Sequence, residues 1–157
     1  MVEMALASTM LFMVLLGILD FGKAFNYWND TNQIAAEGAR YAAVDRVPAG
    51  GTLQSYLRST GDTAELRDGT PVDPDDPDAL RSVPSGLQVC VNYLDTDADG
   101  NAFDVGSTVE VAVSSQYSLL PFLGDELSPA TITIRGRARM RLERAANEVT
   151  PGCEPAA

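Results

Sequence analysis

The sequence predicts an α+β fold in which one long N-terminal α-helix carries an antiparallel β-sheet packed on its C-terminal half. Two observations predict the helix: helix-favouring residues dominate the first forty-odd positions, and the first proline is Pro48. A third observation predicts the sheet, because three later segments alternate apolar and polar residues with the period of a β-strand. We therefore expect a helix over residues 1–45 and a β-rich globular domain over residues 46–157.

Residues 1–20 form the hydrophobic part of the expected helix. No residue from Met4 to Leu19 is charged, and apolar side chains occur on all sides, which indicates burial all round. This run spans about 24 Å, a little less than the ~30 Å hydrocarbon core of a bilayer. We predict that it lies in a membrane before assembly and then packs with copies of itself. The residues expected at that contact are Glu3, Met4, Leu6, Met10, Leu11, Phe12, Val14, Leu15 and Leu16.

Three residues of this helix stand out, and each has two interpretations. Glu3 precedes the apolar run, where the helix N-terminus favours negative charge. Alternatively, Glu3 pairs with a positively charged α-amino group, its own or a neighbour's. Gly17 and Gly22 each cost about 1 kcal/mol relative to alanine inside a helix. They are either helix-bend candidates or sites where a neighbouring helix approaches closely.

The second half of the helix, residues 21–44, is amphipathic. Apolar residues recur at helical spacing on one side, while polar residues interrupt elsewhere. We expect this apolar side to pack against the C-terminal domain. Its members are Phe21, Phe25, Trp28, Ala35, Ala39 and Ala42.

The rest of the chain is expected to form a short helix and three strands. The short helix is predicted at residues 53–60, and the proline- and aspartate-rich stretch 70–78 is predicted to be a surface loop. Strands are predicted at residues 87–93, 109–114 and 131–142, each with one apolar face. An antiparallel sheet of this kind needs a cover on its apolar face, and the amphipathic half of the long helix is the expected cover.

The chain has two cysteines, Cys90 and Cys153, and no CxxC motif. An even number of cysteines in an exported domain suggests a disulfide, whereas two buried free thiols are the alternative. A Cys90–Cys153 bridge would tie the C-terminal tail across the outer face of the sheet.

Charge and residue content argue against two functional classes. The net charge of −11 argues against a nucleic-acid partner, because phosphate binding needs a basic surface. Histidine is absent and no nucleophile motif or paired carboxylate is recognisable, so the sequence gives no support for an enzyme.

Arginines form a row on the last predicted strand. This row is either a solvated face that discourages edge pairing, or a docking surface for acidic loops of a neighbouring subunit. The row consists of Arg135, Arg137, Arg139 and Arg141.

An acidic loop lies between the first two predicted strands. Its D-x-D-x-D-G spacing is how an EF-hand calcium loop begins, but position twelve is a glycine and the flanks are strands. The alternative is a hairpin turn built on Asp-Gly. No motif requires a cofactor, and Ca²⁺ is the one candidate. Its expected ligands are Asp95, Asp97, Asp99, Asn101 and Asp104.

Three motifs in the first 44 residues resemble those of TadE-like proteins, pseudopilins of tight-adherence (Flp-type) pilus systems. The first is Val2-Glu3-Met4-Ala5, followed by the apolar run. The second covers residues 17–23, GILDFGK, and the third covers residues 35–43, AAEGARYAA. A C-terminal element, ARMRLE at residues 138–143, also fits the family pattern.

The resemblance implies a type IV pilin-like fold and a structural role. It implies processing by a prepilin peptidase and contact with the inner-membrane pilus assembly machinery, and taken alone it favours the role of a minor pseudopilin needed for assembly. We nevertheless expect the chain to be the repeating subunit of an extracellular filament, because every copy carries a complete helix-packing face. The remaining alternative is a monomeric membrane-anchored extracellular binding module. Family members carry this glutamate at mature position five, whereas Glu3 is third here. Either further residues precede it, or cleavage differs.

Overall fold

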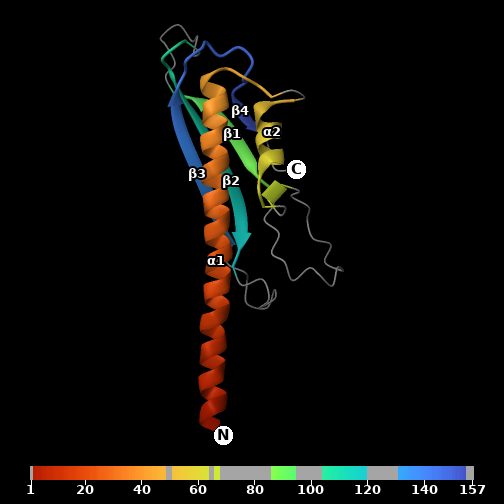
Figure 1. The fold of residues 1–157 in the computed structure, drawn as a ribbon, viewed down its shortest axis with the longest axis vertical. Coiled ribbons are helices and arrows are strands. Elements are labelled where there is room, and N and C mark those ends of the chain that lie inside the picture. Colours follow the sequence, from red (N-terminus) through yellow and green to blue (C-terminus); the bar gives the residue numbers. More distant parts are fainter. Residues whose placement is uncertain are drawn as a thin grey trace.

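The fold was analysed in a computed structural model, which describes residues 2–48, 51–63, 66–67, 86–94, 104–119 and 131–154. One helix runs the length of the molecule, and a four-stranded antiparallel sheet lies against its C-terminal half (Figure 1). This arrangement confirms the predicted α+β, pilin-like layout. We call residues 3–19 the stem, and residues 20–43 together with the remaining described elements the head.

Helix α1, Val2–Ala43, contains 42 residues and so is about 63 Å long. It continues without interruption through Gly17 and Gly22, because alanine, leucine and methionine dominate around them. Glu3 lies in the first turn and Arg40 in the last, which places each charge at the end of the helix dipole that favours it.

The sheet has the strand order β3-β2-β1-β4, and its neighbouring strands are antiparallel. The predicted strands are present as β1 (Gln88–Tyr93), β2 (Thr108–Ser118) and β3 (Thr131–Arg141). Strands β2 and β3 pair over their whole length, from Thr108 opposite Arg141 to Ser118 opposite Thr131. The fourth strand, β4 (Gly152–Glu154), was not predicted, because three residues are too few to show a period of two.

The core lies between the sheet and the two helices α1 and α2, the latter at Leu53–Thr60 as predicted. Thr52 caps α2 because its hydroxyl accepts a hydrogen bond from the Ser55 backbone N–H. Leu53 and Leu57 of α2 are buried, in the same core as the inward-facing valines of the sheet. Those valines are Val89, Val91, Val109, Val111 and Val113, the residues that the alternation assigned to the apolar face.

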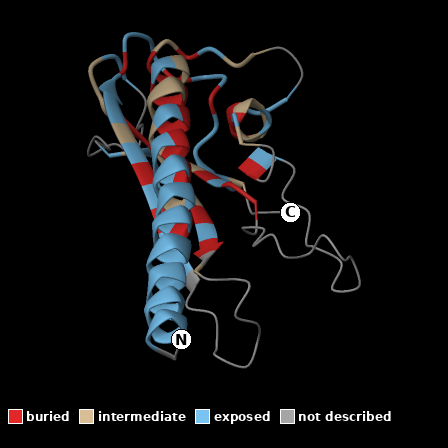
Figure 2. Cartoon of the chain, turned by 60° about the horizontal axis from the view of Figure 1, so that its bottom comes forward, coloured by how far each residue is buried: buried red, intermediate tan, exposed pale blue. Residues whose placement is uncertain are grey.

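The helix face that covers the sheet differs in part from the predicted one. Buried residues of α1 are confined to its C-terminal part, whereas its N-terminal part is exposed throughout (Figure 2). Three alanines of the predicted side are buried, but its aromatic members Phe21, Phe25 and Trp28 are 71%, 56% and 49% exposed. The covered face is rotated relative to the predicted side and shares the three alanines with it. Its buried members are Tyr27, Thr31, Ile34, Ala35, Ala39, Ala42 and Ala43.

Helix α1 approaches the sheet closely at two glycines. A Cβ atom added to Gly136 of β3 would overlap the Thr31 backbone carbonyl, so backbone lies against backbone there. A Cβ at Gly38 would lie 2.6 Å from Leu57 Cδ1 and 3.0 Å from Val111 Cγ1. A larger side chain therefore does not fit at Gly38 or Gly136 as they are packed, whereas nearer the stem the same face accommodates the Tyr27 ring against Tyr117.

Cys90 and Cys153 form a disulfide, as the sequence led us to expect. They face each other in the register of β1 and β4, with their Cα atoms 4.0 Å apart. The bridge therefore holds the last described strand at the edge of the sheet. The division of the chain into two domains at residue 45 stays a prediction. The C-terminal half of α1 shares one hydrophobic core with the sheet.

Candidate assembly site

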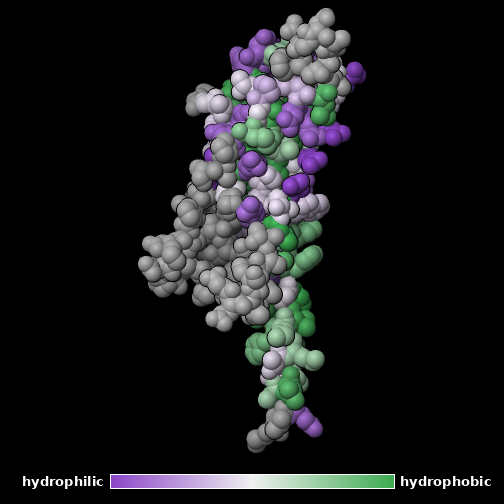
Figure 3. Space-filling model, turned by 180° about the vertical axis from the view of Figure 1, so that it is seen from behind, coloured by the Kyte–Doolittle hydropathy of each residue, from purple (hydrophilic) through white to green (hydrophobic). Residues whose placement is uncertain are grey.

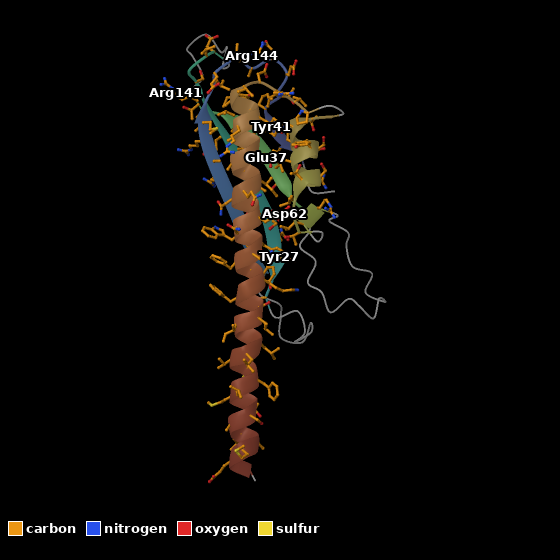
Figure 4. The ribbon with its side chains drawn as sticks, viewed as in Figure 1. Tyr27, Glu37, Tyr41, Asp62, Arg141 and Arg144 are labelled. Carbon is orange, nitrogen blue, oxygen red and sulfur yellow. A yellow bond between two sulfur atoms is a disulfide. The ribbon has the colours of Figure 1, made fainter. Side chains whose placement is uncertain are left out.

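The stem projects beyond the head with every one of its side chains exposed (Figures 1 and 4). Hydrophobic surface covers it almost completely, in contrast to the mostly hydrophilic head (Figure 3). By length and composition, α1 is the one helix in the described chain that is apolar enough to cross a membrane. All nine residues predicted at the assembly contact lie on this free segment, from Glu3 to Leu16.

A buried hydrogen bond marks the level at which the head begins. The Tyr117 hydroxyl donates to Asp20 Oδ1 at 2.6 Å and lies 3.2 Å from the Asp20 backbone oxygen. Asp20 is only 8% exposed, and the Tyr27 ring meets the Tyr117 ring edge to face at 5.3 Å. The sequence analysis did not assign a role to Asp20, although a carboxylate directly after an apolar run was a signal that it needed a buried partner.

A second carboxylate fixes the other end of α1. Asp45 has φ 49°, in the left-handed region that aspartate tolerates better than most residues. Its side chain accepts hydrogen bonds from the backbone N–H groups of Asn147 at 2.9 Å, Glu148 at 2.9 Å and Val149 at 3.0 Å. Burial alone would raise the pKa of Asp45, but these three bonds, aided by the Arg144 charge, lower it below its ordinary value.

Tyr93 extends this attachment to the sheet. Its hydroxyl donates to the Val149 carbonyl at 3.1 Å, so β1 and the C-terminal segment are joined beside Asp45. Burial, and then the negative charge of Asp45, raise the pKa of Tyr93 to about 12. The C-terminal segment is thus held to both α1 and β1 through polar contacts that the alternation pattern does not reveal.

The two α1 glycines at positions 17 and 22 are open to solvent. A Cβ atom added at Gly17 or Gly22 would meet nothing within 4 Å. The protein's own fold therefore gives no steric reason for glycine at either position. Bending of the helix there, and close approach of another helix, both stay predictions.

The arginine row lies on the exposed outer face of β3, at the edge of the sheet. Arg139 Nε lies 2.6 Å from Glu110 Oε2, and Arg141 Nε donates to the Gly106 carbonyl at 3.1 Å. Two of the four arginines therefore have partners within the chain. Docking of the row, Arg135, Arg137, Arg139 and Arg141, on a neighbouring subunit stays a prediction.

The predicted calcium loop lies almost wholly outside the described residues. Asp104 is described and exposed, whereas Asp95, Asp97, Asp99 and Asn101 are not described. Calcium binding stays a prediction from the D-x-D-x-D-G spacing.

Comparison with known proteins gives one match. Residues 1–40 match the family model of TadE-like proteins. No curated protein and no solved structure matches the chain. The matched segment contains the whole stem, Asp20, and the glycines at positions 17, 22 and 38. TadE-like proteins are a structural, pilus-associated family, and residues 1–40 of this chain are TadE-like, as the motifs of the sequence predicted.

Proposed function

We propose that this chain is a structural subunit of a type IV (Tad-like) pilus, which polymerises through its stem into an extracellular filament. The observation that carries the proposal is the stem itself: an apolar helical segment, exposed on all sides, on a folded and acidic head. The TadE-like match over residues 1–40 supports it.

The physical argument is the cost of leaving the stem in water. Burying one large apolar side chain, such as leucine, methionine, phenylalanine, valine or isoleucine, stabilises by about 1.5–3 kcal/mol, and most stem positions carry such a side chain. A bilayer can cover them before assembly, and the stems of other copies can cover them afterwards. The stem therefore stays covered throughout if the chain lies in the membrane first and joins a filament afterwards.

The proposed partners follow from this route. The chain contacts copies of itself through the stem, and a prepilin peptidase and the inner-membrane pilus assembly machinery act on it. The family match favours a second version of the proposal, in which the chain is a minor pseudopilin needed for pilus assembly. A monomeric membrane-anchored module is the alternative that uses the stem only as an anchor.

Fractionation of cells that produce the chain separates these functions. Mechanical shearing releases a filament subunit, whereas an anchored module stays with the cells until detergent extracts it. We expect most of the wild-type chain in the sheared fraction, and Leu11→Asp in the stem to abolish release. The matched control is Leu94→Asp, which changes an exposed leucine of the head. Recovery of the wild-type chain only with detergent would contradict polymerisation.

A further inference from the structure

Three large aromatic side chains are exposed on α1 beside the head. Phe21, Phe25 and Trp28 form what we call the aromatic ridge, with the Phe25 and Trp28 rings 5.6 Å apart. About half or more of each side chain is exposed. Exposed apolar surface of this size, on one side of a helix, marks a contact surface.

The spacing of the ridge continues along the whole stem. Phe21 and Phe25 are four residues apart and Phe25 and Trp28 are three apart, which is the a/d spacing of a coiled coil. The same frame, extended towards the N-terminus, falls on five further exposed apolar residues. These are Met4, Ala7, Leu11, Val14 and Ile18. We call these five and the ridge together the seam.

The polar residues of the same segment lie outside this frame. Ser8 and Thr9 in the stem occupy non-seam positions, and so do Lys23 and Asn26 beside the ridge. A 3.5-residue repeat keeps one side of a helix against a second helix, because it follows the supercoil of a helix pair. The repeat therefore indicates that the partner is an α-helix as well as apolar.

Two glycines of α1 flank the seam. Gly17 directly precedes the a residue Ile18, and Gly22 directly follows the d residue Phe21, so the two glycines lie on opposite sides of the seam. A Cβ atom added at either glycine would meet no described atom within 4 Å. Gly22 also lines a groove of about 450 Å³ together with Ile18, Leu19 and Tyr27. Their lack of side chains allows a second backbone to come close, which the protein's own fold does not use.

The ridge has enough area to matter in association. At about 150–250 Å² per aromatic side chain, its exposed fractions amount to roughly 350 Å² per copy. This is nearly half of the ~800 Å² that each partner buries in a standard protein–protein interface. The five stem residues of the seam add the remainder.

The position of the ridge favours protein over lipid as its cover. Asp20 and Tyr27, in the same helical turns, pack against Tyr117 of β2, so the head already lies against one side of α1 at this level. A ~30 Å hydrocarbon core that begins at Met4 ends at about residue 23, which places Phe25 and Trp28 beyond it. We propose that the seam from Met4 to Trp28 is the docking surface for the helix α1 of a second copy of this chain. The inference rests on the proposed function and names the side of α1 that it uses.

Two adjacent charge substitutions test the proposal. Phe25→Glu places a carboxylate on the seam and Asn26→Glu places the same group one residue away, off the seam; both positions are exposed, so the head folds in each variant. The association constant of the full-length chain is measured by sedimentation equilibrium in zwitterionic detergent micelles. We expect Phe25→Glu to lower it by about tenfold or more, as for a central interface residue, and Asn26→Glu by about twofold or less. Equal effects would overturn the proposal and leave self-association through the stem intact.

Trp28, the single tryptophan, gives an independent readout in phosphatidylcholine vesicles. As the protein-to-lipid ratio rises, its emission should shift to shorter wavelength and its quenching by acrylamide should decrease. Protection that is already complete at the highest dilution would show that lipid covers the ridge, and would overturn the proposal. Association that leaves Trp28 fully quenchable would also overturn it. No association at any ratio or in micelles would contradict the proposed function as well.

Discussion

The stem and the head share one continuous helix, yet the same helix meets different physical demands in its two parts. In the stem every position is exposed, and all side chains except those of Glu3, Ser8 and Thr9 are apolar. In the head α1 lies so close to the sheet that glycine and alanine are required at set positions, and buried carboxylates accept specific hydrogen bonds. Composition is therefore enough to describe the stem, whereas the head depends on individual contacts. The substitutions below test this difference, from the largest expected effect to the smallest.

Removal of the disulfide should destabilise the head and leave the stem helical. The bond joins residues 63 apart in sequence, and closing a loop of that length stabilises by about 4 kcal/mol on the chain-entropy model. We expect a paired Cys90→Ser and Cys153→Ser variant to lose about that much in urea unfolding, followed by tyrosine fluorescence in detergent. Loss of the stem's helical circular dichroism together with the head would contradict the separation of the two parts.

Gly136→Ala should destabilise the head through a backbone clash. The added methyl group meets the Thr31 carbonyl of α1, and neither backbone can move without opening the core. The expected cost is at the upper end of the ~1–3 kcal/mol typical of overpacking. Gly17→Ala in the stem is the matched control, because its added methyl group meets nothing within 4 Å. The control should gain up to about 1 kcal/mol of helix stability. Equal unfolding midpoints for both variants would argue against close packing at Gly136.

Tyr117→Phe should loosen the junction between stem and head. It removes the hydroxyl that donates to the buried Asp20 carboxylate at 2.6 Å, and hydrogen bonds to charged groups contribute about 1.5–3 kcal/mol. The loss should appear in the free energy of unfolding and as faster amide exchange around residues 20–27. Tyr56→Phe, on helix α2 away from this junction, is the comparison variant. Unchanged exchange in Tyr117→Phe would mean that the bond does not hold the junction.

Asp45 should make the head sensitive to acid. Its pKa is lowered on folding, so its contribution is fully present above the ordinary value of about 4 and is lost as pH falls through the folded pKa. Asp45→Asn should lower stability at neutral pH by about 1 kcal/mol and flatten the acid limb of the stability curve. Unfolding midpoints measured from pH 7 to pH 2 check this. An acid limb as steep as that of the wild type would assign the acid sensitivity to other carboxylates.

Calcium should have the smallest effect and act only on the head. If the D-x-D-x-D-G spacing reflects a site, millimolar Ca²⁺ raises the melting temperature of the head, and Asp97→Asn removes the increase. Calorimetric titration of the full-length chain measures the binding directly. An absence of heat and of any thermal shift at millimolar calcium would leave the acidic turn as the correct interpretation.

Periodic features could be predicted from the sequence, and single contacts could not. Helix α1, helix α2 and three strands follow from helical propensity and from the alternation of residues such as Val89 and Val91. Strand β4 could not be predicted, because its three residues are placed by the Cys90–Cys153 bond and not by their own pattern. The helix face was partly misassigned, since Phe25 and Ala39 lie on the same side by spacing, yet only the alanine is buried.

The features of the candidate site were likewise predictable only in part. The apolar run predicted the stem directly, because every one of its positions carries the same signal. The roles of Asp20 and Asp45 depend on Tyr117 and on backbone N–H groups about a hundred residues away. The position of Asp20 after the apolar run could suggest a buried partner, but no local pattern could identify the partner of either residue.

Electron microscopy of sheared cell-surface material tests the central claim most directly, that the stem joins copies of this chain into a filament. An antibody against the head provides the label. The account predicts labelled filaments from cells with the wild-type chain and none from cells with Leu11→Asp, although the head of that variant is folded and its disulfide is formed. Unlabelled filaments, or labelled filaments that persist in the Leu11→Asp variant, would contradict it.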